Sequence, residues 1–233
     1  GMEGKYYVWQ KEEIVSILGK DHGDKFCEYF GVTADGNFDG SNILFLPTNR
    51  GDVSGNIDTV DMSLPSEIEA SKEKLLSYRQ ERESPATDDK ILTGWNAMVI
   101  RALAEAGMFL GRDDYIELAK KSASFLSNSL VGKQNRLMRM YRNGKGKGKG
   151  YLEDYALLID AFIALYESTL DGEWLSRAKK LADCALEIFW YKAQKLFYDT
   201  GKDHEVLIFK PRDIFDNAIP CGSSVMFESL QRL

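Results

Sequence analysis

The sequence predicts a mainly α fold, in which helical hairpins form part of an α/α toroid and are joined by short β-hairpin connections. Two pairs of long helical segments follow each other after residue 91, and their sequences match at an offset of about 60 residues. In each pair the first helix is apolar nearly all round, while the second has one apolar stripe and a lysine-bearing face. A helix that is apolar all round is buried on every side, so inner and outer helices should alternate around an axis.

The N-terminal part of the chain, residues 2–62, predicts a cap of short elements around an aromatic strand. Its helices should be short because a glycine stops each of them. Residues 47–61 predict a polar loop, and Pro65 suits the first turn of a charged helix that ends near Glu83. The expected elements of the cap are a strand at 5–9, helices at 11–18 and 24–30, and a partner strand at 42–46.

Residues 63–233 predict the helical hairpins, which together with the cap fit a single domain over residues 2–233. The repeat is longer than the ~34 to ~47 residues of common helical solenoid units, so it suits two helices with long connections. A third unit begins at Pro220 and reaches Leu233 after one helix. The hairpins pair 92–110 with 113–130 and 152–170 with 173–190, and β-like connections cover 136–142, 195–199 and 205–210.

Acidic residues mark one inner helix in particular. Its residues 152–165 are nearly all apolar, yet Glu153, Asp160 and Glu167 fall at i, i+7 and i+14 and form one stripe. A buried acidic stripe suggests a cavity lined by carboxylates.

Acidic residues also recur before or at the start of every predicted inner helix. Because these helix ends should open on one face of a toroid, we expect the carboxylates to converge there. Capping of the helix N-terminus explains each of them equally well when taken alone. The candidate catalytic residues are Glu153, Asp89 and Asp216, and the candidate substrate-binding residues are Asp88, Trp95, Asn96, Tyr151, Asp154, Tyr155, Arg79 and Arg82.

Composition excludes several classes of partner. A net charge of −6 argues against nucleic acid or an anionic membrane, because both attract basic surfaces. No apolar run reaches the ~20 residues of a membrane span. The three cysteines have no CxxC spacing, which favours a reducing compartment, and we expect a cytoplasmic protein without metal or cofactor.

Two further patterns have ordinary explanations. Residues 144–150 alternate glycine and lysine but lack the spacing of a phosphate-binding loop, so a mobile surface connection is expected. His204 lies in a polar turn and has no partner at metal-ligand spacing, which predicts a surface histidine.

Four motifs follow each other along the chain: residues 3–9, residues 88–92 with Trp95-Asn96, residues 150–156 and residues 216–224. Together they resemble the YyaL and spermatogenesis-associated thioredoxin-domain family. The resemblance implies a thioredoxin-like domain followed by a six-hairpin toroid similar to glycosidases and N-acylglucosamine 2-epimerases. This sequence has no thioredoxin-like part and only two full hairpins, so we expect a fragment.

Two functions follow as hypotheses. The first is a glycoside hydrolase or sugar epimerase-like protein, with Glu153 as general acid and Asp89 or Asp216 as base. The alternative is a non-catalytic module that binds a glycan or a partner protein at the same mouth. An incomplete ring also leaves inner helices uncovered, which predicts a homodimer through their exposed faces. The N-terminal segment with Tyr6, Tyr7 and Trp9 is the other candidate to cover them.

Overall fold

The structure is a computed structural model that describes residues 4–47 and 66–233. The chain forms two compact units, Gly1–Thr87 and Asp88–Leu233, and each has its own hydrophobic core. The single domain expected over residues 2–233 stays a prediction.

The described part of the first unit holds helices α1 (Lys11–Leu18), α2 (Lys20–Tyr29) and α3 (Ser66–Gln80). Gly19 ends α1 at a φ of 80°, a conformation that glycine adopts without strain, and α2 begins at the next residue. Helix α2 therefore starts earlier than the sequence predicts. The buried side chains that join these helices include Ile14, Phe26 and Leu75.

The aromatic strand expected at residues 5–9 is wrong in extent. It is reduced to one antiparallel bridge, in which Trp9 and Asn42 exchange backbone hydrogen bonds of 2.9 and 2.7 Å. The buried Asn42 side chain accepts a hydrogen bond from the backbone N–H of Thr33 and donates to the carbonyls of Thr33 and Trp9, so it closes the loop between residues 33 and 42. The loop predicted at residues 47–61 and the helix start at Pro65 lie, apart from Pro47, outside the described residues.

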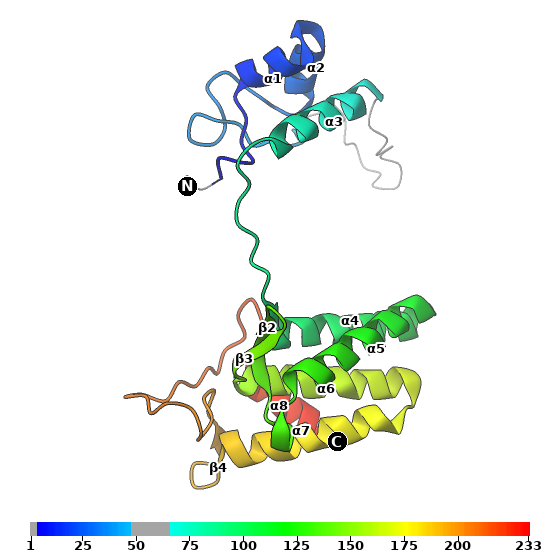
Figure 1. The fold of residues 1–233 in the computed structure, drawn as a ribbon, viewed down its shortest axis with the longest axis vertical. Helices are drawn as coiled ribbons and strands as arrows, with labels where there is room; N and C mark the ends of the chain where they lie inside the picture. Colours follow the sequence, from blue (N-terminus) through cyan, green and yellow to red (C-terminus); the bar gives the residue numbers. More distant parts are fainter. Residues whose placement is uncertain (1–3, 48–65) are drawn as a thin grey trace, which may run out of the picture. The chain divides into compact units, whose positions relative to one another are not determined.

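The second unit contains two helical hairpins and a further helix in its described chain (Figure 1). Its elements are β1 (Ile91–Leu92), α4 (Thr93–Leu110), α5 (Asp113–Leu130), the 3-10 turn Lys133–Asn135, β2 (Met138–Arg142), β3 (Lys145–Lys149), α6 (Leu152–Thr169), α7 (Gly172–Phe189), β4 (Trp190–Tyr191), β5 (Leu196–Phe197) and α8 (Gly222–Arg232).

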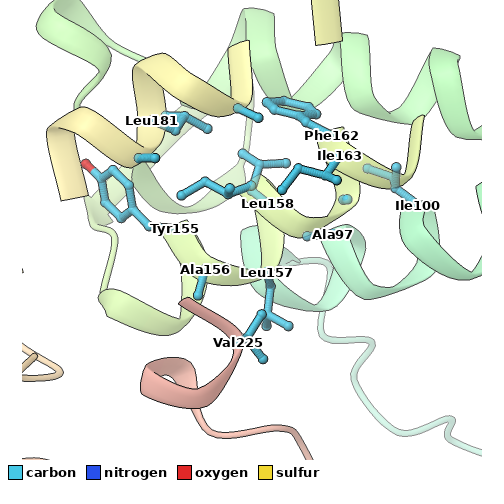
Figure 2. Packing of buried hydrophobic residues seen from close by; sticks show 14 of the residues in the cluster. Ala97, Ile100, Tyr155, Ala156, Leu157, Leu158, Phe162, Ile163, Leu181 and Val225 are labelled. Atoms are coloured by element: carbon cyan, nitrogen blue, oxygen red, sulfur yellow. The ribbon is translucent and has the colours of Figure 1, made fainter. Parts of the chain in front are cut away.

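Helix α6 lies at the centre of this unit. It packs on α4 on one side and α8 on the other, while α5 and α7 cover α4 and α6 from outside. Figure 2 shows Leu157 of α6 beside Val225 of α8, and Ile163 of α6 beside Ile100 of α4. The inner helices α4, α6 and α8 thus alternate with outer helices, and the predicted mainly α fold with a partial α/α toroid is confirmed.

The connection after α5 is a three-stranded antiparallel sheet of order β1-β2-β3. Its strand β3 is the glycine and lysine segment, so the mobile connection expected there is wrong. A side chain at Gly146 would meet the carbonyl of Ser129 and the side chain of Leu130, which explains why glycine faces the helices. The lysines of β3 face solvent.

The connection after α7 is a small hairpin. Leu196 and Phe197 of β5 pair with Tyr191 and Trp190 of β4, whereas residues 205–210 form no strand. The β-like connection predicted at residues 205–210 is therefore wrong, and the residues just after α7 pair with Leu196 and Phe197. Among the described residues, no helix is long and apolar enough to cross a membrane.

Candidate functional site

The N-terminal ends of α4, α6 and α8 meet in the second unit. The backbone N–H of Gly94 on α4 donates a 3.1 Å hydrogen bond to the Asp154 carboxylate on α6. Gly222 of α8 lies so close to α6 that an added Cβ would stand 2.9 Å from the backbone nitrogen of Glu153. Two glycines thus let three helix ends approach closely, and the first turn of α6 lies between the other two.

Asp154 is the buried centre of this junction. Besides Gly94, its carboxylate accepts hydrogen bonds from the backbone N–H of Tyr151 and from Arg139 of β2, both at 2.9 Å. Burial raises the pKa of Asp154, and the guanidinium of Arg139 opposes that rise. A carboxylate with no exposed surface and these partners holds helix ends together, so the structure assigns Asp154 a structural part.

Glu153 points the other way, into a cavity of about 280 Å³. Its carboxylate also bonds Arg139, whose guanidinium therefore links Glu153 and Asp154. The same cavity is lined by Tyr151 and by two acidic residues that sequence reasoning missed, Asp199 and Asp213.

Asp199 and Asp213 belong to the irregular connection between β5 and α8. The Asp199 carbonyl accepts a 3.0 Å hydrogen bond from Leu152, and its carboxylate accepts one of 2.7 Å from the Asp213 backbone. Burial raises the pKa of Asp199, and the negative charges of Asp213 and Glu153 raise it further, against the lowering effect of the backbone N–H of Asp213. No periodicity or spacing in the sequence marks either residue.

Asp89 and Asp216 make other contacts. Asp89 forms a 2.5 Å ion pair with Arg142 of β2, and Asp88 pairs with Lys90 at 3.1 Å. Asp216 accepts a 2.8 Å hydrogen bond from the backbone of Cys221, at the start of α8. The cavity lining includes Glu153 but none of these three aspartates, and their expected part in catalysis or binding stays a prediction.

The two tyrosines among the candidate residues, Tyr151 and Tyr155, differ in how much of their surface is exposed. Tyr151 is 39% exposed and lines the cavity, with its ring stacked on His204 at 5.2 Å between centroids. Tyr155 has no exposed surface and its hydroxyl accepts a 2.7 Å hydrogen bond from Leu137, so it is a core residue rather than a sugar platform. The expectation of a surface His204 is also wrong: its side chain is 11% exposed, and burial lowers its pKa.

The remaining candidates on α4 lie near its first turn. Trp95 is 58% exposed, whereas the Asn96 side chain donates a 2.8 Å hydrogen bond to the carbonyl of Leu92, one turn earlier. Neither lines the Glu153 cavity.

Arg79 and Arg82 belong to the first compact unit, where both have partners. Arg82 donates to the backbone carbonyl of Tyr6 at 3.0 Å and to Glu13 at 2.7 Å, and its guanidinium lies 4.1 Å from the ring centre of Trp9. Arg79 lies over the Tyr6 ring at 5.4 Å. The substrate-binding role expected for Arg79 and Arg82 stays a prediction.

The acidic stripe of α6 is matched by arginines. Asp160 is 1% exposed and bonds Arg101 of α4 and Arg232 of α8, both at 2.5 Å. Arg232 also bonds Glu167 at 2.8 Å. The carboxylates of Asp160 and Glu167 therefore form ion pairs with arginines and do not line an open cavity without counter-charges. Over the described ranges no cluster of three or more His, Cys, Asp or Glu side chains is placed to hold a metal ion.

Nearly the whole of this chain is similar to a part of several known proteins. Spermatogenesis-associated protein 20 of Homo sapiens is 29% identical, with 99% of this chain and 33% of the human protein covered. The Mus musculus protein is 27% identical with the same coverage, and an uncharacterised protein of Caenorhabditis elegans is 28% identical, with 100% of this chain and 35% of that protein covered. The predicted resemblance to this family is confirmed. No protein-family model matches the chain.

The chain spans about a third of the length of these relatives. Similar solved structures are a family 76 α-mannanase of Bacteroides thetaiotaomicron, at 15% identity and a TM-score of 0.46, with 57% of this chain and 41% of that chain covered. A cellobiose 2-epimerase of Bacillus thermoamylovorans follows at 13% and 0.45, covering 58% and 42%. A family 105 glycoside hydrolase of C. acetobutylicum has 12% and 0.49, covering 70% and 51%.

Proposed function

We propose that the protein acts on a carbohydrate in the Glu153 cavity, as a glycoside hydrolase or a sugar epimerase-like enzyme. The supporting observation is that one cavity carries Glu153, Asp199 and Asp213 together with the half-exposed ring of Tyr151. Glycoside chemistry needs two carboxylates at one bond, one to give a proton and one to act as base or nucleophile. A flat aromatic ring beside them offers a surface for a sugar ring.

The raised pKa of Asp199 decides the roles that we assign. A general acid must keep its proton near the working pH, which burial and neighbouring negative charge favour. Asp199 is therefore the proposed acid. Glu153, expected from the sequence to be the acid, becomes the base or nucleophile, held by Arg139. Asp89 and Asp216, the bases expected earlier, take a supporting part because Arg142 and the Cys221 backbone engage them.

A panel of mono- and oligosaccharides, assayed for both binding and turnover, tests the proposal. Asp199→Asn and Glu153→Gln should each lower turnover by about 100-fold or more while binding persists. Asp183→Asn is the control, because this residue of α7 is exposed and pairs only with a surface lysine. Absence of binding for every sugar, or full turnover in both variants, would overturn the proposal.

The alternative is a non-catalytic module that binds a glycan or a partner protein at the same mouth. Asp213 and the connection around it are exposed, which favours this alternative, because an active site that is open to solvent excludes water poorly. Binding of a sugar without turnover, unchanged in Asp199→Asn, would select it.

The proposal also includes the oligomeric state, because one inner helix has an exposed apolar face. Exposed apolar side chains follow one face of α4 at helical spacing, with Trp95, Val99 and Phe109 at 58%, 57% and 78% exposure. A homodimer that covers this face is therefore part of the proposal.

The cysteines indicate the compartment that we propose. All three are free thiols, which supports a reducing compartment such as the cytoplasm.

A further inference from the structure

A second cavity of about 240 Å³ lies beside the Glu153 cavity. Its walls come from the three inner helices and from the connection that leads into α8. The residues that matter here are Arg101, Ala102 and Glu105 of α4, Leu157 and Asp160 of α6, and Pro220.

The two cavities are neighbours along α6. Pro220, which is exposed, lines both of them. Glu153, Leu157 and Asp160 are spaced i, i+4 and i+7, so they share one face of the helix. At 1.5 Å per residue, Glu153 and Asp160 are about 10 Å apart along the helix axis. Helix α8 covers this face, because Gly222, Val225 and Arg232 lie against Glu153, Leu157 and Asp160. An extended ligand therefore passes from one cavity to the other over the exposed residue Pro220, which lines both.

The second cavity offers the groups that a sugar ring uses. Arg101 donates from Nε to Glu105 at 2.8 Å and from Nη1 to Asp160, and its guanidinium remains 36% exposed. Its Nη2 donors and the 40% exposed carboxylate of Glu105 then present a donor beside an acceptor, which suits two adjacent sugar hydroxyls. Ala102, which is exposed, supplies apolar surface beside them.

Asp160 acts here through Arg101. Its carboxylate is buried and fixes the guanidinium in place, as a positioning residue rather than a contact for a ligand. The ion pairs of Asp160 alone would explain a clamp between helices, but they do not require a cavity beside the clamp or the pair of Arg101 and Glu105 on its wall.

We infer that the site takes an oligosaccharide of at least two units, with one unit in the Glu153 cavity and the next in the cavity of Arg101 and Glu105. This inference rests on the proposed carbohydrate function. It adds a substrate class, because a free monosaccharide would fill only one of the two cavities.

Calorimetric titration of the full chain with two series tests the inference: glucose, cellobiose and cellotriose, and mannose, mannobiose and mannotriose. In the series that binds, the disaccharide should bind about ten-fold or more tightly than the monosaccharide. Ala102→Trp fills the second cavity and should remove this preference while leaving the monosaccharide affinity unchanged. Leu118→Trp, on an exposed position of α5, is the matched control and should keep the preference.

Glu105→Gln provides a second variant that keeps the side-chain size, and it should weaken disaccharide binding alone. It decides the outcome if Ala102→Trp lowers the melting temperature. Equal affinities for mono- and disaccharide, or a preference that survives in Glu105→Gln and Ala102→Trp, would overturn the inference and leave the proposed function standing. Absence of binding for both series would instead overturn the proposed function, and this inference with it.

Discussion

Arg101 on α4 donates a 2.5 Å hydrogen bond from Nη1 to the buried carboxylate of Asp160 on α6. Arg232 on α8 donates to the other oxygen of the same carboxylate at 2.5 Å. Burial raises the pKa of Asp160, and the two guanidinium groups oppose that rise. One buried carboxylate therefore ties the three inner helices together.

Removing both arginines should cost more than removing the carboxylate. Arg101→Met with Arg232→Met leaves a buried charge without a counter-charge, which should lower the free energy of unfolding by about 3–5 kcal/mol. Asp160→Asn leaves partly exposed arginines that water can solvate, and should cost about 1–3 kcal/mol. Urea denaturation measures both. Lys179→Met, which breaks an exposed pair, is the control at about 0–1 kcal/mol. An equal cost for the control and the double variant would contradict the clamp.

Glu153 and Asp154 are neighbours in sequence, yet their substitutions should differ in effect. Glu153→Gln keeps the side-chain size and changes a residue that faces a cavity, so the free energy of unfolding should fall by less than about 1 kcal/mol. Asp154→Ala leaves the Gly94 and Tyr151 N–H groups and Arg139 without their acceptor, and should cost about 3–5 kcal/mol. Thermal and urea unfolding give the comparison. Unfolding of Glu153→Gln would make Glu153 a structural residue.

Gly222 should tolerate no side chain. An added Cβ would stand 2.9 Å from the Glu153 nitrogen, so Gly222→Ala must push α8 away from α6 and should lower both stability and sugar binding. Gly172, in the first turn of α7, has open space around its Cβ position, and Gly172→Ala should stabilise by about 0.4–1 kcal/mol. Melting temperatures that move in the same direction in both variants would argue against the close approach of α6 and α8.

Asp199 should make stability depend on pH in a defined direction. Its pKa in the folded protein lies above the ~3.9 of an unfolded chain, so its ionisation costs more in the folded state. Relative to Asp199→Asn, the wild type is most stable below the unfolded pKa and loses that advantage as pH rises through the folded pKa. The variant should therefore melt at least as high as the wild type at pH 7, with Glu173→Gln as an exposed control. A variant that is destabilised only at neutral pH would reverse this sign.

The exposed face of α4 should be covered by a second copy. Light scattering at tens of micromolar should report a dimer, because burying a large apolar side chain contributes about 1.5–3 kcal/mol. Val99→Asp should shift the mass toward the monomer, whereas Leu118→Asp, on the outer face of α5, should not. A monomeric mass for the wild type would remove this interface.

By itself the sequence determined the hairpins and the division into inner and outer helices. The reason is that the pattern of apolar residues along one helix indicates how many of its sides are buried, as the nearly continuous apolar run of α6 shows. The same local pattern placed Glu153 and Asp154 at a helix start. It could not say which of them faces a cavity, since neighbours on a helix differ by about 100° in direction and only the partners decide what each one meets.

Those partners are distant in sequence and were decided by tertiary packing alone. Asp154 is buried because Gly94 and Arg139 reach it from α4 and β2, and Asp199 joins Glu153 because its connection folds back over the first turn of α6. Tyr155 also depends on a distant partner, because its buried hydroxyl accepts a hydrogen bond from the backbone N–H of Leu137. A buried polar group needs a hydrogen-bond partner, and when the fold supplies that partner from a distant part of the chain, the local sequence cannot predict it.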